Sequence, residues 1–250
     1  MGLKRSRILL VLLVSCFCLQ VCSCQTDRIT SSQFIKDPES IVSNGNIYKL
    51  GFFSPEESSD RYVGIWYTNI SEQTVIWVAN RNNPVKNSSG ILTISEDGNL
   101  VVLSEENRII WSSNVSIFAT NTSAQLLDSG NLVLQNNSDG NRIWESFHQP
   151  SDSFLLQMTL STDARIGKNL QLVSWKSPSD PSTGNFSFGI GQVSIPELFI
   201  WNNGHPFYRT GPWNGHIFLG IPDYFHSGNC FWCFLLQLEL RRKDVKKSFG

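Results

Sequence analysis

Two stretches of this 250-residue chain repeat each other: GNLVVLSEENRIIW at residues 98–111 and GNLVLQNNSDGNRIW at residues 130–144. Each contains a turn, an apolar strand, a polar turn, and then Arg, Ile and Trp. A looser third copy is GNIYKLGFFSPEESSDRYVGIW at residues 45–66, and VIW at residues 75–77 adds another Ile-Trp pair. A hairpin cannot bury its apolar face alone, so three or more units must pack together. The repeat predicts a pseudo-threefold β domain over residues 25–147.

The rest of the chain has the same all-β character. Short runs rich in Val, Ile, Phe and Trp, such as YVGIWY, TVIWVAN and ILTI, alternate with turn clusters such as EDGN and DSGN. This spacing is typical of a sandwich, barrel or prism. After Trp144 Pro and Ser become frequent, but the apolar runs LQLVSW, NFSFGI and ELFIW persist. We expect a second, less regular β domain over residues 148–222 and a divergent tail with little structure over residues 223–250.

The composition permits a sizeable core and gives no sign of a nucleic-acid partner. Hydrophobic residues make up 40% of the chain and charged residues 16%, with eight Trp and sixteen Phe. Such a content of aromatic residues is not that of a disordered chain. The formal net charge is −1, and the main body has no contiguous basic stretch, so nucleic-acid binding is not expected.

The first 24 residues indicate a secretory signal peptide. Lys4, Arg5 and Arg7 precede the apolar core ILLVLLVSCFCL, and CSC supplies small residues before Gln25. An uncleaved membrane anchor is the alternative, but the stretch is short for the roughly 20 apolar residues of a spanning helix. Cleavage would leave only Cys230 and Cys233 of the six cysteines, so no disulfide framework is expected in the main body.

Six N-x-S/T triplets support the secretory interpretation and predict a glycoprotein whose modified residues lie on solvent-facing loops. The candidate N-glycosylation sites are Asn69, Asn87, Asn114, Asn121, Asn136 and Asn185.

One alternating stretch could bind a sugar. In SEDGNLVVL a strand would project Asp97, Asn99 and Val101 to one face. A carboxylate that accepts, an amide that donates and accepts, and one apolar contact suit a hydroxyl-bearing ligand. The alternative is structural, because Asp-Gly and Gly-Asn are common turn dipeptides.

The same stretch resembles the Q-x-D-x-N-x-V-x-Y motif of bulb-type mannose-binding lectins, whose fold is a β-prism of three four-stranded sheets. Ser95 stands in place of Gln and Leu103 in place of Tyr. The second repeat keeps Asn131 and Val133, and in the first copy Asn46 alone matches. The resemblance implies the prism fold. Each lost polar partner removes about 0.5–1.5 kcal/mol, which predicts weak or absent mannose binding.

A longer resemblance covers residues 26–222. YKLGFF, YVGIWY, VIWVANR, LLDSGNLVL, WESFHQPSDSFLL, SWKSPSDPSTGNFSF and FYRTGPWNGHIFLGIP occur in the order found in plant G-type lectin S-receptor-like serine/threonine kinases and S-locus glycoproteins. It implies a bulb-type lectin domain, and then the start of a second lectin-like (S-locus glycoprotein) domain. Full-length relatives would be single-pass plasma-membrane kinases, whereas this chain would be extracellular.

The sequence lacks several common catalytic motifs. The sequence has no H-R-D, D-F-G, H-E-x-x-H, G-x-S-x-G or Walker A pattern. Zinc binding at Cys230 and Cys233 would need two further ligands. We therefore expect no enzyme activity, metal or cofactor in this chain.

Three functions remain open at this stage. The first is an extracellular recognition module for a protein or glycan ligand; the resemblance links it to pollen self-incompatibility and to receptor pairing through the lectin domains. The second is a mannose-type lectin that uses Asp97, Asn99 and Val101. The third is the sensing fragment of a receptor serine/threonine kinase whose kinase half is missing.

Overall fold

The structure is a computed structural model that describes residues 26–71, 73–116, 121–163, 168–191 and 195–220. The described residues form antiparallel β-sheets and one short 3-10 helix, η1 (Ser146–His148), which confirms the all-β prediction. The predicted signal peptide at residues 1–24 and the tail at residues 223–250, with Cys230 and Cys233, lie outside the described residues. Within the described ranges no helix is long and apolar enough to cross a membrane.

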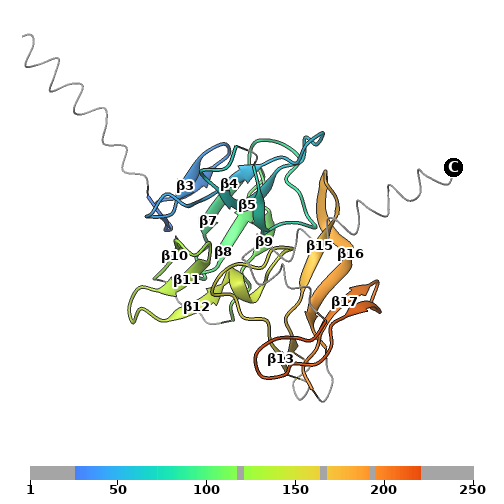
Figure 1. The fold of residues 1–250 in the computed structure, drawn as a ribbon. Coiled ribbons are helices and arrows are strands. Elements are labelled where there is room, and N and C mark those ends of the chain that lie inside the picture. The colour runs from blue at the N-terminus through green and yellow to red at the C-terminus, as the bar shows by residue number, and fades with distance from the viewer. Residues whose placement is uncertain (1–25, 72, 117–120, 164–167, 192–194, 221–250) are drawn as a thin grey trace, which may run out of the picture.

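Three consecutive three-stranded meanders form the body of the prism (Figure 1). Within each meander, a turn joins each strand to the next, and neighbouring strands are antiparallel. The strands are β4 (Tyr48–Phe53), β5 (Tyr62–Tyr67) and β6 (Val75–Val78) in the first sheet; β7 (Ile91–Ile94), β8 (Leu100–Leu103) and β9 (Ile109–Ser112) in the second; and β10 (Thr122–Leu126), β11 (Leu132–Asn136) and β12 (Arg142–Glu145) in the third.

The fourth strand of every sheet comes from one N-terminal segment, residues 28–42, which we call the strap. It contains β1 (Arg28–Ile29), β2 (Ile35–Lys36) and β3 (Ser40–Val42). These pair with β10, β7 and β4 respectively, so the strap serves the third, second and first sheets in turn. Arg61 fixes the strap to the start of β5 by donating two hydrogen bonds to the buried carboxylate of Asp37, one of them 2.6 Å long.

A row of inward-facing side chains crosses each sheet from the strap to the last strand. Ile41, Ile35 and Ile29 begin the three rows, and each is buried. The rows are Ile41–Leu50–Ile65–Trp77, Ile35–Leu92–Val102–Trp111 and Ile29–Ala124–Leu134–Trp144. All twelve side chains belong to one core cluster or pack against it, so apolar burial along the prism axis is what holds the three sheets together.

The three rows end in a tryptophan cluster. The ring centroids of Trp77, Trp111 and Trp144 are 5.7–6.0 Å apart, and every pair is edge-to-face, the arrangement that aromatic quadrupoles favour. Of the four Ile-Trp pairs in the repeated stretches, three direct their Trp into this shared interior. Trp66 is the exception: it lies on β5 one residue after the inward Ile65 and packs against Phe53 in a separate cluster.

The third repeat lies elsewhere than the sequence pattern indicated. Trp77, and not Trp66, is the counterpart of Trp111 and Trp144, so the repeat is residues 61–77 and not 45–66. GNIYKL resembles GNLVVL, but it forms the turn into β4, the second strand of its sheet. Asn46 therefore does not occupy the motif position that the sequence comparison gave it.

Another β-sheet follows the prism. β15 (Leu172–Ser177), β16 (Asp180–Ile190), β17 (Leu198–Asn202) and β18 (His205–Arg209) form one four-stranded antiparallel sheet in sequence order, which we call the second β unit. Its own small core contains Leu172, Phe188 and Ile200. A two-stranded ribbon, β13 (Thr162–Asp163) and β14 (Lys168–Asn169), precedes it.

Candidate functional site

The predicted sugar-binding residues lie at the turn from β7 into β8, where Asp97 is exposed. Asn99 is 6% exposed and Val101 is 1% exposed. The structure brings Asp97 and Asn99 into contact: Asn99 Nδ2 donates to Asp97 Oδ2 over 3.0 Å. Val101 is enclosed and is not offered to solvent.

The amide of Asn99 is already used by the protein. Its Oδ1 accepts hydrogen bonds from Val115 N (2.7 Å) and Ser113 Oγ (2.9 Å). Its Nδ2 donates to Val115 O over 3.3 Å as well as to Asp97. A side-chain amide has two donors and two acceptor lone pairs, so these four contacts account for all of its hydrogen-bonding capacity.

Asp97 also stabilises the turn. It accepts hydrogen bonds from Ser95 Oγ and from both nitrogens of Asn99. These bonds favour the charged carboxylate, so they hold the pKa of Asp97 below its ordinary value. Ser95 stands at the Gln position of the lectin motif, and its hydroxyl points back to the turn.

The third sheet repeats this arrangement. Asn131 Oδ1 accepts from Ser146 Oγ over 3.1 Å and from Phe147 N over 3.3 Å, and its Nδ2 donates to Glu145 Oε2 over 2.6 Å. Val133 is 1% exposed. In both recognisable copies of the motif, the side-chain amide of the Asn, Asn99 or Asn131, is therefore directed into the fold.

In the first sheet the equivalent positions hold different residues. Ile65 pairs with Trp77 as Val102 pairs with Trp111, so the two sheets can be aligned at these residues. The motif positions of the second sheet, Asp97, Asn99, Val101 and Leu103, then correspond to Asp60, Tyr62, Gly64 and Trp66. Tyr62 is buried, and burial is the main cause that raises its pKa to about 12. A Cβ at Gly64 would lie 2.6 Å from the Phe53 ring, so this position is covered by an aromatic side chain.

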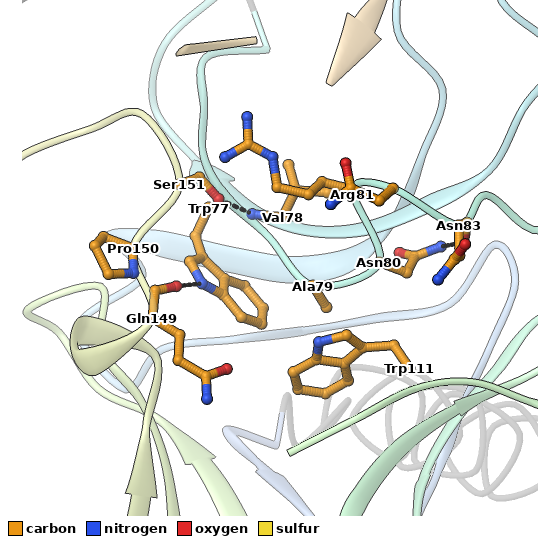
Figure 2. Close-up of a pocket in the computed structure, with 11 residues that line it drawn as sticks. Trp77, Val78, Ala79, Asn80, Arg81, Asn83, Trp111, Gln149, Pro150 and Ser151 are labelled. Atoms are coloured by element: carbon orange, nitrogen blue, oxygen red, sulfur yellow. Dashed lines mark hydrogen bonds between the residues drawn. The ribbon is translucent and has the colours of Figure 1, made fainter. Parts of the chain in front are cut away.

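An open cavity of about 300 Å³ lies at the end of the prism that carries the tryptophan cluster (Figure 2). The wall consists of residues 77–83, from the end of β6 into the segment that follows it, together with Trp111 and residues 149–151. Two hydrogen bonds join these walls: Trp77 Nε1 to Gln149 O, and Val78 N to Ser151 Oγ, each 2.9 Å long. Figure 2 shows the rings of Trp77 and Trp111 and the side chain of Gln149 lining the space.

Arg81, beside this cavity, connects the prism to the second β unit. Its guanidinium donates to three backbone carbonyls, those of Pro181 (2.8 Å), Val173 (3.1 Å) and Ser174 (2.8 Å). Asn82 Oδ1 accepts from Thr183 N over 2.9 Å nearby. The two units are therefore joined by directed bonds to backbone as well as by the ring contact between Phe53 and Trp175.

Asp152 lies near Arg81 without a full set of partners. Its Oδ1 is buried and has no hydrogen-bond partner within the described residues. Burial raises the pKa of this carboxyl to about 6, and the positive charge of Arg81 opposes the rise. The segment after η1 thus carries an acid that titrates close to neutral pH.

Sequence reasoning missed both Arg81 and Asp152. Arg81 lies in VIWVANR and Asp152 in HQPSDSF, and both positions are outside the repeated stretches at residues 98–111 and 130–144. The roles of both residues depend on contacts between segments far apart in the chain, which no local pattern reveals. No group of three or more His, Cys, Asp and Glu that suits a metal ion occurs within the described ranges.

Comparison with known proteins matches part of the chain to a known family. A family model described as D-mannose binding lectin matches residues 74–176. A mannose-binding lectin of Gastrodia elata is 26% identical and covers 48% of this chain and 96% of its own, with a TM-score of 0.38. The two-domain Scilla campanulata agglutinin is 17% identical, covers 72% of this chain and 67% of its own, and has a TM-score of 0.28. The family match is what assigns a bulb-type lectin domain to the chain.

Curated relatives narrow the family. A G-type lectin S-receptor-like serine/threonine-protein kinase of Arabidopsis thaliana is 48% identical over 221 residues, which are 86% of this chain and 27% of the relative. The S-locus-specific glycoprotein S6 of Brassica oleracea is 41% identical over 206 residues, 80% of this chain and 47% of the glycoprotein. Over this region the chain is a homologue of the plant S-receptor-like kinases and S-locus glycoproteins. It spans about a quarter of the length of the kinases it matches.

Proposed function

We propose that this chain is an extracellular, non-catalytic recognition module that binds a protein or glycan ligand, and that the mannose-motif positions do not carry the binding. The observation that supports the proposal most directly is the saturated amide of Asn99. A sugar hydroxyl would have to displace Val115 N or Ser113 Oγ from Asn99 Oδ1, and the displaced buried donor would then lack a partner. That exchange gains little, because an unsatisfied buried group costs about 1–3 kcal/mol.

The family relationship supports the recognition role. The relatives are receptor-like kinases and an S-locus glycoprotein, and the matched part is the lectin region. In this proposal the lectin region faces the outside of the cell and is the sensing part of a longer receptor or of a secreted glycoprotein. Recognition in pollen self-incompatibility, and receptor pairing through lectin domains, are narrower proposals that rest on the family resemblance.

The rival function is mannose binding through Asp97, Asn99 and Val101. One observation favours it: Asp97 is exposed and charged, so its carboxylate can accept a further hydrogen bond from a sugar. It lacks the Gln and Tyr of the lectin motif beside it, and Val101 is covered.

The test is calorimetric titration of the secreted glycoprotein with methyl α-mannoside and with a branched mannose oligosaccharide, followed by a glycan array. We expect no saturable binding of mannose in the titration. We also expect that any ligand found on the array binds the Asp97→Ala variant as well as the unmodified protein. A micromolar dissociation constant for mannose that is lost in Asp97→Ala, and kept in Glu96→Ala from the same turn, would replace this proposal with the rival function.

A further inference from the structure

A second cavity, of about 340 Å³, lies on the first sheet and is distinct from the one at the tryptophan cluster. Its wall is formed by the strap end at Val42, by Lys49 on β4, by Trp66 on β5, and by the turn after β5 that contains Asn69. We call it the Trp66 pocket. It combines two aromatic residues, Trp66 and Tyr67, with one lysine and one candidate glycosylation site.

Trp66 is directed outward because it follows the inward Ile65 on the strand. One part of its ring packs on Phe53. Lys49, opposite it on β4, holds its ammonium 5.9 Å from the ring centroid. The negative face of an aromatic ring attracts cations and polarised C–H groups, and a pyranose presents such C–H groups on its apolar face.

Hydrogen bonds hold the Asn69 turn against the β3–β4 turn. Thr68 N donates to Ile47 O over 3.0 Å, and Thr68 Oγ1 donates to Asn46 O. Asn69 Nδ2, the atom that would bear a glycan, also points to Asn46 O at 3.4 Å. Because Asn46 and Asn69 both line the Trp66 pocket, a sugar attached at Nδ2 starts at the wall of that pocket. A glycosylated amide keeps one N–H, so the contact with Asn46 O can persist.

We propose that Asn69 is N-glycosylated and that the first N-acetylglucosamine of its glycan occupies the Trp66 pocket. The Lys49 ammonium, which lies over the Trp66 ring in the absence of a sugar, moves aside and donates to the acetamide oxygen, and the sugar's C–H face takes its place on the ring. Attachment transfers an oligosaccharide from a lipid-diphosphate donor in the secretory pathway. The bond from Nδ2 to the anomeric carbon forms as the carbon–oxygen bond to the diphosphate breaks, and Nδ2 loses one proton. The glycan then closes this face of the first sheet to other ligands.

This inference does not depend on the proposed recognition function, because it concerns the protein's own glycan. Asn87 supplies a matched control. It is an exposed candidate site on a turn, and its Nδ2 donates to Glu105 Oε2 over 2.8 Å.

The experiment uses the glycoprotein secreted by eukaryotic cells. Mass spectrometry of peptides measures occupancy at Asn69 and Asn87, and a time course with an endoglycosidase under native conditions measures how fast each glycan is released. We expect the Asn69 glycan to be released at least about tenfold more slowly than the Asn87 glycan, because burial against Trp66 shields the linkage. In Trp66→Ala the two rates should become equal.

Lys49→Ala is the second variant, in case Trp66→Ala is not secreted; it should speed release at Asn69 severalfold and leave Asn87 unchanged. An unoccupied Asn69 would overturn the proposal. Equal release rates at Asn69 and Asn87 in the unmodified protein would also overturn it, as would a slow rate at Asn69 that neither variant changes.

Discussion

Val115 N donates a hydrogen bond to Asn99 Oδ1 over 2.7 Å, across sixteen residues of chain. This bond ties the loop after β9 to the start of β8, and with Ser113 it fills the acceptor positions of the amide. Asn99 thus stabilises the second sheet from the position at which a mannose-binding lectin would present it to sugar.

Asn99→Ala should therefore lower stability. The substitution leaves Val115 N and Ser113 Oγ without their acceptor, and we expect a loss of about 1–3 kcal/mol in the free energy of unfolding. Chemical denaturation measures it, with Glu96→Ala from the same turn as control. Equal stabilities of the two variants would contradict the structural role of this amide.

Trp144→Ala should cost about 3–5 kcal/mol, because it removes a buried ring, one of the three in the tryptophan cluster. Trp66→Ala should cost clearly less, since Trp66 is only half-buried and lies outside that cluster. Urea unfolding followed by far-ultraviolet circular dichroism compares the two. A loss for Trp66→Ala as large as for Trp144→Ala would mean that the interior is organised differently.

Arg81→Met should loosen the second β unit from the prism. Three carbonyls, of Pro181, Val173 and Ser174, lose their donor at once. Limited proteolysis should then cut severalfold faster and leave a fragment that ends between about residues 145 and 225, because protease access follows local opening. Arg108→Met, an exposed position on the β8–β9 turn, is the matched control. Unchanged cutting in Arg81→Met would show that other contacts hold the junction.

Acidification should stabilise the junction. The folded-state pKa of Asp152 is raised to about 6, above its unfolded value, so the folded state binds the proton more tightly. Stability from this group increases as the pH falls through 6, by about 1 kcal/mol between pH 7 and pH 5. Unfolding at the two pH values measures the effect, and Asp152→Asn should remove it. A fall in stability over this range that Asp152→Asn leaves unchanged would contradict the assignment.

Secretion and glycosylation give the fifth prediction. All six candidate asparagines lie in the described residues, and all are exposed except the half-buried Asn136. Expressed in plant cells, the protein should migrate above its polypeptide mass of 28.2 kDa and shift down after glycosidase treatment. An unglycosylated cytosolic product would be the opposite result.

The fold could be predicted from sequence because each repeat is a short continuous stretch of the chain. The stretches at residues 98–111 and 130–144 each carry a turn, a strand and the Trp that reaches the interior, and the structure places Trp111 and Trp144 together. The first sheet was misaligned because its second turn, residues 54–61, is long. GNIYKL resembles the start of the repeat but leads into β4, whereas the true start lies before β5.

The site was less predictable, since side-chain direction depends on partners far away in sequence. Asp97 and Asn99 were expected together and are together. That Asn99 is saturated follows from Val115 and Ser113, which no local pattern of residues 95–103 reveals. The strap did leave a signal that was overlooked, because Ile29, Ile35 and Ile41 recur every six residues and each begins one row of the interior.

The strap also sets the order in which this protein can be completed during synthesis. β1 is among the first described residues to leave the ribosome, but its partner β10 begins at Thr122 and the last strand of that sheet ends at Glu145. The first sheet can close early, since β3 and β4 are neighbours. Ile29 cannot make its contacts with Ala124, Leu134 and Trp144 until more than a hundred further residues have been synthesised. Such long-range closure slows folding and leaves apolar surface exposed until the third sheet is complete.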